Sequence, residues 1–317
     1  MRILLVKTSS LGDVIHNLPV VSDLKRSLPE AEIDWCVEEN FAAIPRLHPG
    51  VNQVLPVAVR RWRKALFHAS TWKEMRAFRS GLRAKPYDLI LDTQGLIKSA
   101  LVARQARGPL LGYAAEAARE PLAARFYDRT FAIPKAAHAV ERNRWLAAAA
   151  FGYPVDLPLD YGIAAPALAA DWLPPEPYAV LLTATSRDDK LWEEARWTAL
   201  GQALGERGIR CVLPAGSPAE RQRAARLAAT LPGAVAAPPL GLGQLAGLLA
   251  GARLTVGVDT GLTHLSAALR VPTVALYTAT EPGLTGVLGT GFCRNLGGPG
   301  RSPEAGAVFD MLQAVLA

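Results

Sequence analysis

The segment Leu254–Leu265, with the sequence LTVGVDTGLTHL, constrains the fold of this chain more than any other. Its first five residues form an apolar, β-branched run, which predicts a buried strand, and Asp259-Thr260-Gly261 then ends that strand in a turn. An apolar, Ala-rich stretch follows and predicts a helix, and Thr273–Tyr277 predicts a second strand. A strand, a tight turn, a helix and a strand in this order predict an α/β unit, in which ligands bind at the carboxyl ends of the strands.

The turn carries groups that suit an anionic ligand. It places the Asp259 carboxylate, the Thr260 hydroxyl and unpaired backbone N–H groups at the start of a helix, where the helix dipole favours negative charge. His264 lies one turn into the helix, from where it can point back toward the same ligand. The alternative is that Asp259 merely caps the helix and His264 is a surface histidine, and the turn alone leaves both interpretations open.

Length and composition predict two soluble domains. The chain has 317 residues, of which 50% are hydrophobic and 20% charged, and residues 152–177 contain six prolines that indicate a linker. We therefore expect domains at residues 1–160 and 161–317, with the last helix, at 303–316, able to pack back on the N-terminal domain.

The first apolar run is too short for a signal peptide, and no stretch has the ~20 apolar residues of a membrane span, so we expect a cytoplasmic protein. Three distant cysteines predict neither a disulfide framework nor a zinc site.

Positive charge is concentrated in the first half of the chain. Residues 1–150 hold 23 Lys and Arg against 14 acids, whereas residues 151–317 hold 12 against 14. Four of the cations, in the sequence RRWRK, are Arg60, Arg61, Arg63 and Lys64, and a basic stripe with helical spacing follows at residues 73–83. No acid lies between residues 60 and 73, so we expect this repulsion to be relieved by a polyanion, either lipid phosphates or nucleic acid. The alternative is a solvated face.

The first strand and helix resemble the start of a nucleotide-binding domain. Arg2–Lys7 predicts a strand and Val14–Leu28 a helix, but the loop between them has only Gly12 and lacks the G-x-G-x-x-G pattern, which disfavours a nicotinamide cofactor. Asp13 lies where the helix begins. It is either a carboxylate favoured by the helix dipole or a general base at the mouth of a cleft.

Three loops of the second half follow predicted strands, at residues 185–190, 216–220 and 259–261. The carboxyl ends of parallel strands meet at one edge of a sheet, so we expect these loops to converge. Hydroxyls, a lysine and a helix N-terminus suit a diphosphate, and carboxylates suit sugar hydroxyls. Together they predict a nucleotide-sugar pocket. A P-loop phosphoryl transferase is excluded because the chain has no G-x-x-x-x-G-K-[ST] pattern.

Three segments, RILLVKTSSLGDVIHNLP, TATSRDDKLW and GVDTGLTHLSAAL, resemble the bacterial heptosyltransferases of lipopolysaccharide core assembly, and the middle one is more similar to type I than to type II members. The resemblance implies an α/β fold of the GT-B type, with two Rossmann-like domains that face a central cleft. It implies an inverting, metal-independent transfer of L-glycero-D-manno-heptose from ADP-heptose to the first Kdo of Kdo-lipid A. We expect no cofactor and a monomer, although the sequence itself does not give the oligomeric state. The location implied is peripheral, on the cytoplasmic face of the inner membrane.

The resemblance also implies roles for single residues. Asp13 is the expected catalytic base, Asp259 is expected to hold heptose hydroxyls, and Glu220 to bind the nucleoside. The resemblance implies that Thr185, Ser186, Lys190 and His264 lie at the diphosphate. The turn of Thr260 and Gly261, at the helix N-terminus, is expected to stabilise the charge of the same group. From the excess of positive charge in the first half, we expect five cations to bind acceptor anions: Arg60, Arg61, Arg63, Lys64 and Lys98.

Two other functions remain as alternatives. One is a type II enzyme that acts on a heptose acceptor. The other is a basic nucleic-acid-binding protein, which leaves the acidic second half unexplained and lacks the aromatic platform expected for single strands.

Overall fold

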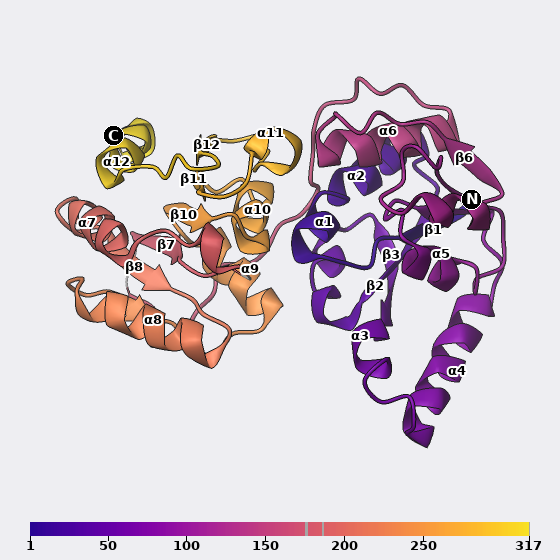
Figure 1. Cartoon of the computed structure of the whole chain (residues 1–317), viewed down its shortest axis with the longest axis horizontal. Helices are drawn as coiled ribbons and strands as arrows, with labels where there is room; N and C mark the ends of the chain where they lie inside the picture. The colour runs from indigo at the N-terminus through magenta and orange to yellow at the C-terminus, as the bar shows by residue number, and fades with distance from the viewer. Residues whose placement is uncertain (175–176, 186, 317) are drawn as a thin grey trace. The chain divides into compact units, whose positions relative to one another are not determined.

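The computed structural model describes residues 1–174, 177–185 and 187–316. The chain divides into two compact units, Met1–Ile163 and Ala164–Ala317, which are called unit 1 and unit 2 here. Each unit is built around one six-stranded parallel sheet (Figure 1).

The sheet of unit 1 has the strand order β3-β2-β1-β4-β5-β6. Its strands are β1 Arg2–Val6, β2 Glu32–Glu38, β3 Val51–Val57, β4 Leu89–Asp92, β5 Leu110–Tyr113 and β6 Arg129–Phe131. This is the order of a Rossmann sheet, in which the chain leaves the first strand toward one edge and returns at its other side. The crevice that this reversal creates lies beyond the carboxyl ends of β1 and β4, which pair in parallel.

Helices cover both faces of the first sheet. They are α1 Leu11–Ile15, α2 Leu18–Ser27, α3 Val59–Trp62, α4 Ala69–Arg83, α5 Ile97–Ala103 and α6 Ala139–Phe151, with short 3₁₀ helices η1 Glu39–Phe41, η2 Pro45–Leu47 and η3 Pro121–Phe126. On one face Leu4 and Val6 pack with Trp62, Leu82 and Ala100 of α3, α4 and α5, whereas α2 and α6 contact each other elsewhere in the unit.

The single helix that we predicted over residues 14–28 is wrong. The structure has two helices, α1 and α2, with Asn17 at the N-cap of α2 and Pro19 in its first turn. Proline has no N–H to continue the preceding helix but fits the first turn of a new one, so the chain stops and restarts here.

The sheet of unit 2 repeats the same order, β12-β11-β10-β7-β8-β9. Its strands are β7 Tyr178–Leu182, β8 Arg210–Leu213, β9 Val235–Ala236, β10 Leu254–Val258, β11 Thr273–Tyr277 and β12 Cys293–Gly297. The switch point here lies between β7 and β10, which pair in parallel.

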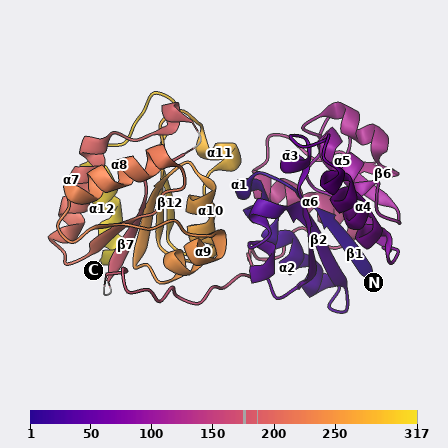
Figure 2. The same cartoon turned by 90° about the horizontal axis from the view of Figure 1, so that it is seen from below.

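The helices of unit 2 are α7 Glu194–Gly205, α8 Pro218–Ala229, α9 Leu242–Ala250, α10 Gly261–Ala268, α11 Pro282–Thr285 and α12 Ala305–Leu316, with η4 Asp188–Lys190. Apolar residues of α7, α8 and α12 share one core with the sheet, and α10 packs with α9 (Figure 2). Val308 and Leu312 place α12 in this core, whereas the sequence had left packing on the N-terminal domain open. Among the described residues, no helix is long and apolar enough to cross a membrane.

Candidate active site

In unit 2 an ion pair joins two of the predicted loops at the switch point. Lys190 Nζ donates to Asp259 Oδ2 at 2.6 Å, and both side chains are mostly buried, at 18% and 14% exposed. Thr280 Oγ1 donates to the same carboxylate oxygen at 2.8 Å, and Thr185 Oγ1 donates to the Asp259 backbone carbonyl at 3.1 Å. Loops that follow β7, β10 and β11 therefore meet at one carboxylate.

The same place contains the N-terminus of α10. Thr260 is the N-cap residue, with an extended backbone and no side-chain capping bond, and Gly261 begins the helix. Gly257 lets the helix lie close to β10, because a Cβ at this position would be 2.3 Å from Thr263 Oγ1. His264 is buried on α10, one turn after Gly261. The arrangement offers an ammonium, hydroxyls and a helix N-terminus to an anion.

Glu220 has a local structural role in the third predicted loop. Its Oε2 accepts hydrogen bonds from the backbone N–H groups of Gly216 (2.8 Å) and Ser217 (2.9 Å), and Ser217 Oγ accepts one from Glu220 N–H at 3.2 Å. This is a capping box, which fixes the entry to α8 just beyond β8. Ser186 lies outside the described residues.

In unit 1 Asp13 lies at the switch point, in the first turn of α1. Its carboxylate accepts two hydrogen bonds from Arg119, with Nη2–Oδ1 at 2.6 Å and Nη1–Oδ2 at 3.1 Å, and one from Ser10 N–H at 2.8 Å. Burial raises the pKa of Asp13, but the charges of Lys7 and Arg119 and the Ser10 hydrogen bond outweigh burial and hold the pKa below its ordinary value. Asp13 is therefore ionised at neutral pH, as a general base must be.

Lys7 is the second cation beside Asp13. It is only 4% exposed, and its Nζ donates to the Thr93 carbonyl at 2.7 Å and to Asn143 Oδ1 at 3.2 Å. Burial lowers the pKa of Lys7 to about 8. Lys7, Asp13 and Arg119 line a cavity of about 20 Å³, which is room for one water molecule.

The predicted acceptor cations lie in two places. Lys98 is exposed on α5 and its Nζ donates to Ser9 Oγ at 3.1 Å, in the loop that precedes Asp13. The other four cations follow β3, and all four are exposed: Arg60, Arg61, Arg63 and Lys64. Our expectation that the repulsion among the latter is uncompensated is wrong for Arg61, which pairs with Glu39 and Glu74 at 3.0 and 2.8 Å. Glu39 lies 22 residues before Arg61 and Glu74 directly after the interval 60–73, so a search for acids within that interval missed both.

Sequence reasoning missed three residues that the structure brings to these sites. Thr280 follows β11, the neighbour of β10, so the rule about strand ends could have found it. Lys7 was placed on a strand, but its burial beside Asp13 was not foreseen. Arg119 lies 106 residues from Asp13 in the chain, in a loop with no motif, and had no signal.

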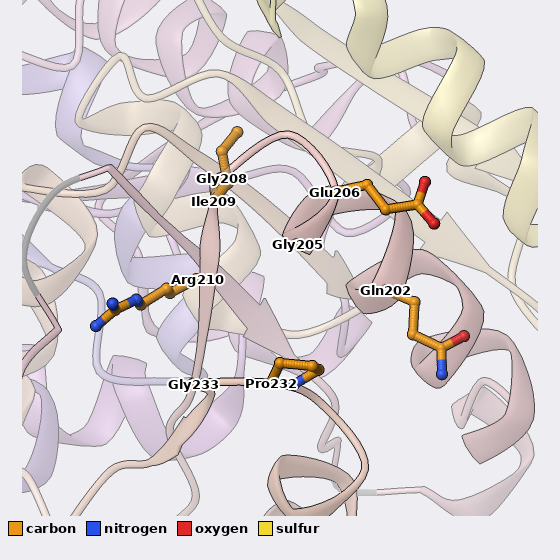
Figure 3. Close-up of a pocket in the computed structure, with 8 residues that line it drawn as sticks. All are labelled: Gln202, Gly205, Glu206, Gly208, Ile209, Arg210, Pro232 and Gly233. Atoms are coloured by element: carbon orange, nitrogen blue, oxygen red, sulfur yellow. The ribbon is translucent and has the colours of Figure 1, made fainter.

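A hollow of about 690 Å³ in unit 2 lies at the opposite edge of the sheet from Asp259. It is formed at the end of α7 and at Arg210, the first residue of β8. In Figure 3 the charged groups of Arg210 and Glu206 point away from each other, so they do not converge on a common ligand atom. We assign no function to this hollow.

Comparisons with known proteins identify the relatives of this chain. Residues 75–301 match the family model "Glycosyltransferase family 9 (heptosyltransferase)". Lipopolysaccharide heptosyltransferase 1 of Pseudomonas aeruginosa is 50% identical over 291 residues, which cover 91% of this chain and 82% of that protein. The structure of E. coli heptosyltransferase WaaC with ADP superposes with a TM-score of 0.91 at 44% identity and covers 99% of this chain and 100% of that one.

Two further solved structures share this fold. WaaC has also been solved with ADP-2-deoxy-2-fluoro heptose, with a TM-score of 0.88 and 99% of both chains covered. E. coli ADP-heptose lps heptosyltransferase II superposes with a TM-score of 0.78 at only 24% identity, covering 100% of this chain and 98% of that one. With two Rossmann-type sheets and this match to WaaC, the predicted α/β fold of the GT-B type is confirmed.

Proposed function

This chain belongs to glycosyltransferase family 9, the heptosyltransferase family, and we propose that it acts as a heptosyltransferase of type I in lipopolysaccharide synthesis. The observation that carries this assignment is the 50% identity to a lipopolysaccharide heptosyltransferase 1 over 91% of the chain. E. coli heptosyltransferase II is only 24% identical to this chain, which shows a shared fold but does not support the type II alternative. The proposed reaction transfers L-glycero-D-manno-heptose from ADP-heptose to the first Kdo of Kdo-lipid A with inversion, without a metal ion or cofactor.

Unit 2 supplies the donor side of this reaction, which we propose for residues 161–317. The diphosphate of ADP-heptose gains negative charge as the bond to the sugar breaks. Lys190 and the N-terminus of α10 can stabilise that charge with groups already fixed in place. Asp259, held by Lys190 and Thr280, would accept hydrogen bonds from heptose hydroxyls. Thr185, Ser186, Thr260 and His264 are proposed around the phosphates.

Glu220 is the donor residue whose proposed role the geometry restricts. One carboxylate oxygen, Oε2, already accepts two backbone N–H groups. A nucleoside contact by Glu220 would therefore use Oε1, with the capping box holding the side chain in position.

Unit 1 supplies the base, and we propose residues 1–160 as the acceptor domain. The ionised carboxylate of Asp13 takes the proton of the acceptor hydroxyl while the hydroxyl oxygen attacks the anomeric carbon of the heptose. The bond from that carbon to the phosphate oxygen breaks, and ADP leaves with the electron pair. A single displacement from the opposite face inverts the configuration. A positioned base of this kind contributes about 10²–10⁴-fold to the rate.

The acceptor carries phosphates and carboxylates, which the basic half of the chain suits. We propose that Lys98 and the cations that follow β3 bind these anions. Arg63 and Lys64 are the most available for this role, since no carboxylate of the described chain pairs with them. Arg61 would have to break or share its ion pairs with Glu39 and Glu74 to bind an acceptor anion. Because the acceptor is a lipid, the enzyme would work at the cytoplasmic face of the inner membrane, and we propose separately that it is a monomer.

The decisive experiment offers the purified protein ADP-heptose with two acceptors, Kdo-lipid A and its heptosylated form, and detects the product by mass spectrometry. Addition of one heptose to Kdo-lipid A alone is the expected result, and it should persist in the presence of a chelator. Transfer only to the heptosylated acceptor would favour the type II alternative, and no transfer to either would contradict both.

Asp13→Ala tests the base. We expect turnover to be lost while the affinity for ADP-heptose, measured by calorimetry, stays near that of the wild type. Asp156→Ala is a matched control, because Asp156 is an exposed aspartate of the same unit. A kcat above about a tenth of the wild-type value would exclude Asp13 as the base, given the ~10²–10⁴-fold contribution expected.

The acceptor cations require a separate variant in which Arg60, Arg61, Arg63 and Lys64 are all replaced by glutamine. We expect a raised KM for a water-soluble acceptor and an unchanged donor affinity. Acceptor kinetics that equal those of the wild type at both low and high salt would reduce these cations to a solvated face.

A further inference from the structure

Three large apolar side chains are exposed together where α3 connects to α4. Leu66 is 44% exposed, Phe67 103% and Trp72 49%. Trp72 Nε1 donates to the Leu66 carbonyl at 2.7 Å, which ties the first turn of α4 to this connection. Figure 1 shows the connection at the end of α4 that projects farthest from the sheet of unit 1. We call Leu66, Phe67 and Trp72 the apolar tip.

The fold of unit 1 does not need the apolar tip. Other residues attach α4 to the core of unit 1. Leu82 of α4 is buried in that core, and Phe78 of α4 packs edge-to-face on the buried Trp62 of α3, with ring centroids 5.7 Å apart. Single exposed apolar residues are common, but a cluster that includes a fully exposed phenylalanine is typical of a binding surface.

Positively charged residues flank the apolar tip on both sides along the chain. The stretch from α3 to the end of α4 holds eight Lys and Arg residues and a single acid, Glu74. That acid is already engaged by Arg61 and by Trp62 Nε1. Within the described parts of the chain, no carboxylate pairs with three exposed cations of α4 that we call the basic flank: Lys73, Arg76 and Arg79. Arg63 and Lys64, which we proposed for the acceptor anions, are not counted in it.

We propose that the apolar tip inserts into an anionic phospholipid surface, with the basic flank on the lipid phosphates. Apolar and aromatic side chains flanked by Lys and Arg are the combination that binds the interface of anionic bilayers. A second copy of the chain is disfavoured as the occupant, because equal positive charges would meet. Single-stranded nucleic acid could stack bases on Phe67 and Trp72 but would leave the exposed Leu66 without a partner, whereas the apolar interior of a bilayer suits all three side chains. This inference rests on the proposed function in one respect: an enzyme whose acceptor is a membrane lipid has to bind the membrane surface.

The experiment measures binding of the full chain to phosphatidylglycerol-containing vesicles and to pure phosphatidylcholine vesicles by cosedimentation. We expect the wild type to bind only the anionic vesicles, and less at high salt. The double variant Leu66→Ser/Phe67→Ser should bind at least about tenfold more weakly, because it removes the apolar groups that enter the bilayer. Leu122→Ser is the matched control, since Leu122 is a 53% exposed leucine of the same unit outside this segment, and it should bind as the wild type does.

Activity separates the apolar tip from acceptor recognition. The double variant should transfer heptose to a water-soluble acceptor without acyl chains at the wild-type rate, but more slowly to the acylated acceptor in vesicles. Equal losses with both acceptors would overturn the membrane role while leaving the proposed function intact. If the wild type transferred heptose to neither acceptor, the proposed function would fail and the vesicle measurements would still decide the role of the apolar tip.

Two other outcomes would also overturn the proposal. One is tip-dependent binding of a single-stranded oligonucleotide without binding to vesicles, which would assign the surface to nucleic acid. The other is tip-dependent self-association in sedimentation velocity without binding to vesicles, which would assign it to a second copy.

Discussion

Replacing Lys7 by methionine removes a buried charge next to the candidate base. Lys7 is 4% exposed, and burial lowers its pKa from the ordinary value of 10.5 to about 8 in the folded protein. In the unfolded chain the lysine has its ordinary pKa. Between about pH 8 and pH 10.5 the unfolded state therefore binds more protons than the folded state, so the free energy of unfolding rises with pH over this window.

The size of this effect follows from the two pKa values. They lie about 2.5 pH units apart and each unit corresponds to about 1.4 kcal/mol, so the charged form of Lys7 destabilises the fold by about 3 kcal/mol below pH 8. Lys7→Met has no such charge. From pH 7 to pH 10 we therefore expect the wild type to gain about 2.5 kcal/mol in its free energy of unfolding relative to the variant.

The assay is urea denaturation followed by circular dichroism at several pH values in this range, for the wild type and for two uncharged variants, Lys7→Met and Lys7→Gln. The two variants differ in packing and hydrogen bonding, so their absolute stabilities will differ, but both should show the same dependence on pH relative to the wild type. A stability difference that is constant across the range would refute the idea that burial lowers the pKa of Lys7.

Three further predictions concern single contacts. Arg119→Gln removes one of the cations that lower the pKa of the candidate base, so the acidic limb of the pH profile of kcat/KM should move to higher pH; an unmoved limb would argue against the pairing. Arg144→Met leaves Asp23, 2% exposed, as an unpaired buried carboxylate and should lower the free energy of unfolding by about 3 kcal/mol at pH 7. This loss should shrink at low pH as Asp23 becomes protonated, and equal losses at both pH values would contradict it. Gly257→Ala places a Cβ 2.3 Å from a threonine hydroxyl on α10 and should cost about 1–3 kcal/mol, unlike Gly243→Ala, whose Cβ would meet nothing within 4 Å.

Much of the architecture could be predicted because buried parallel strands have a strong local signal. The runs that form β1, β7, β10 and β11 are apolar and end in turn residues, so their place in a parallel sheet followed from the sequence alone. The edge strands β6, β9 and β12 were missed. They are short or polar, as in Arg129–Phe131 and Cys293–Gly297, and it is pairing with a neighbour rather than composition that makes them strands.

The contacts of the candidate site likewise include some that could be predicted from the sequence and some that could not. The meeting of Lys190 with Asp259 could be anticipated, because both residues follow strands whose carboxyl ends share one edge of the sheet. The pairing of Arg119 with Asp13 could not, because it depends on where a loop of unit 1 returns after β5. The partners of Arg61 likewise come from outside its own segment. Contacts between irregular segments have no period in the sequence, so only the folded chain shows them.

The position of α12 has a consequence for the order in which the protein forms during synthesis. Val308 and Leu312 belong to the same core as Leu181 of β7, so this core contains residues from the start and the end of unit 2. The ribosome must therefore deliver residues 305–316 before the sheet of unit 2 can be covered. Unit 1 is complete at Ile163 and can fold while the rest is still being translated. Nascent unit 2 thus exposes apolar strands for longer, and it is the part of the chain for which we expect chaperones to matter most.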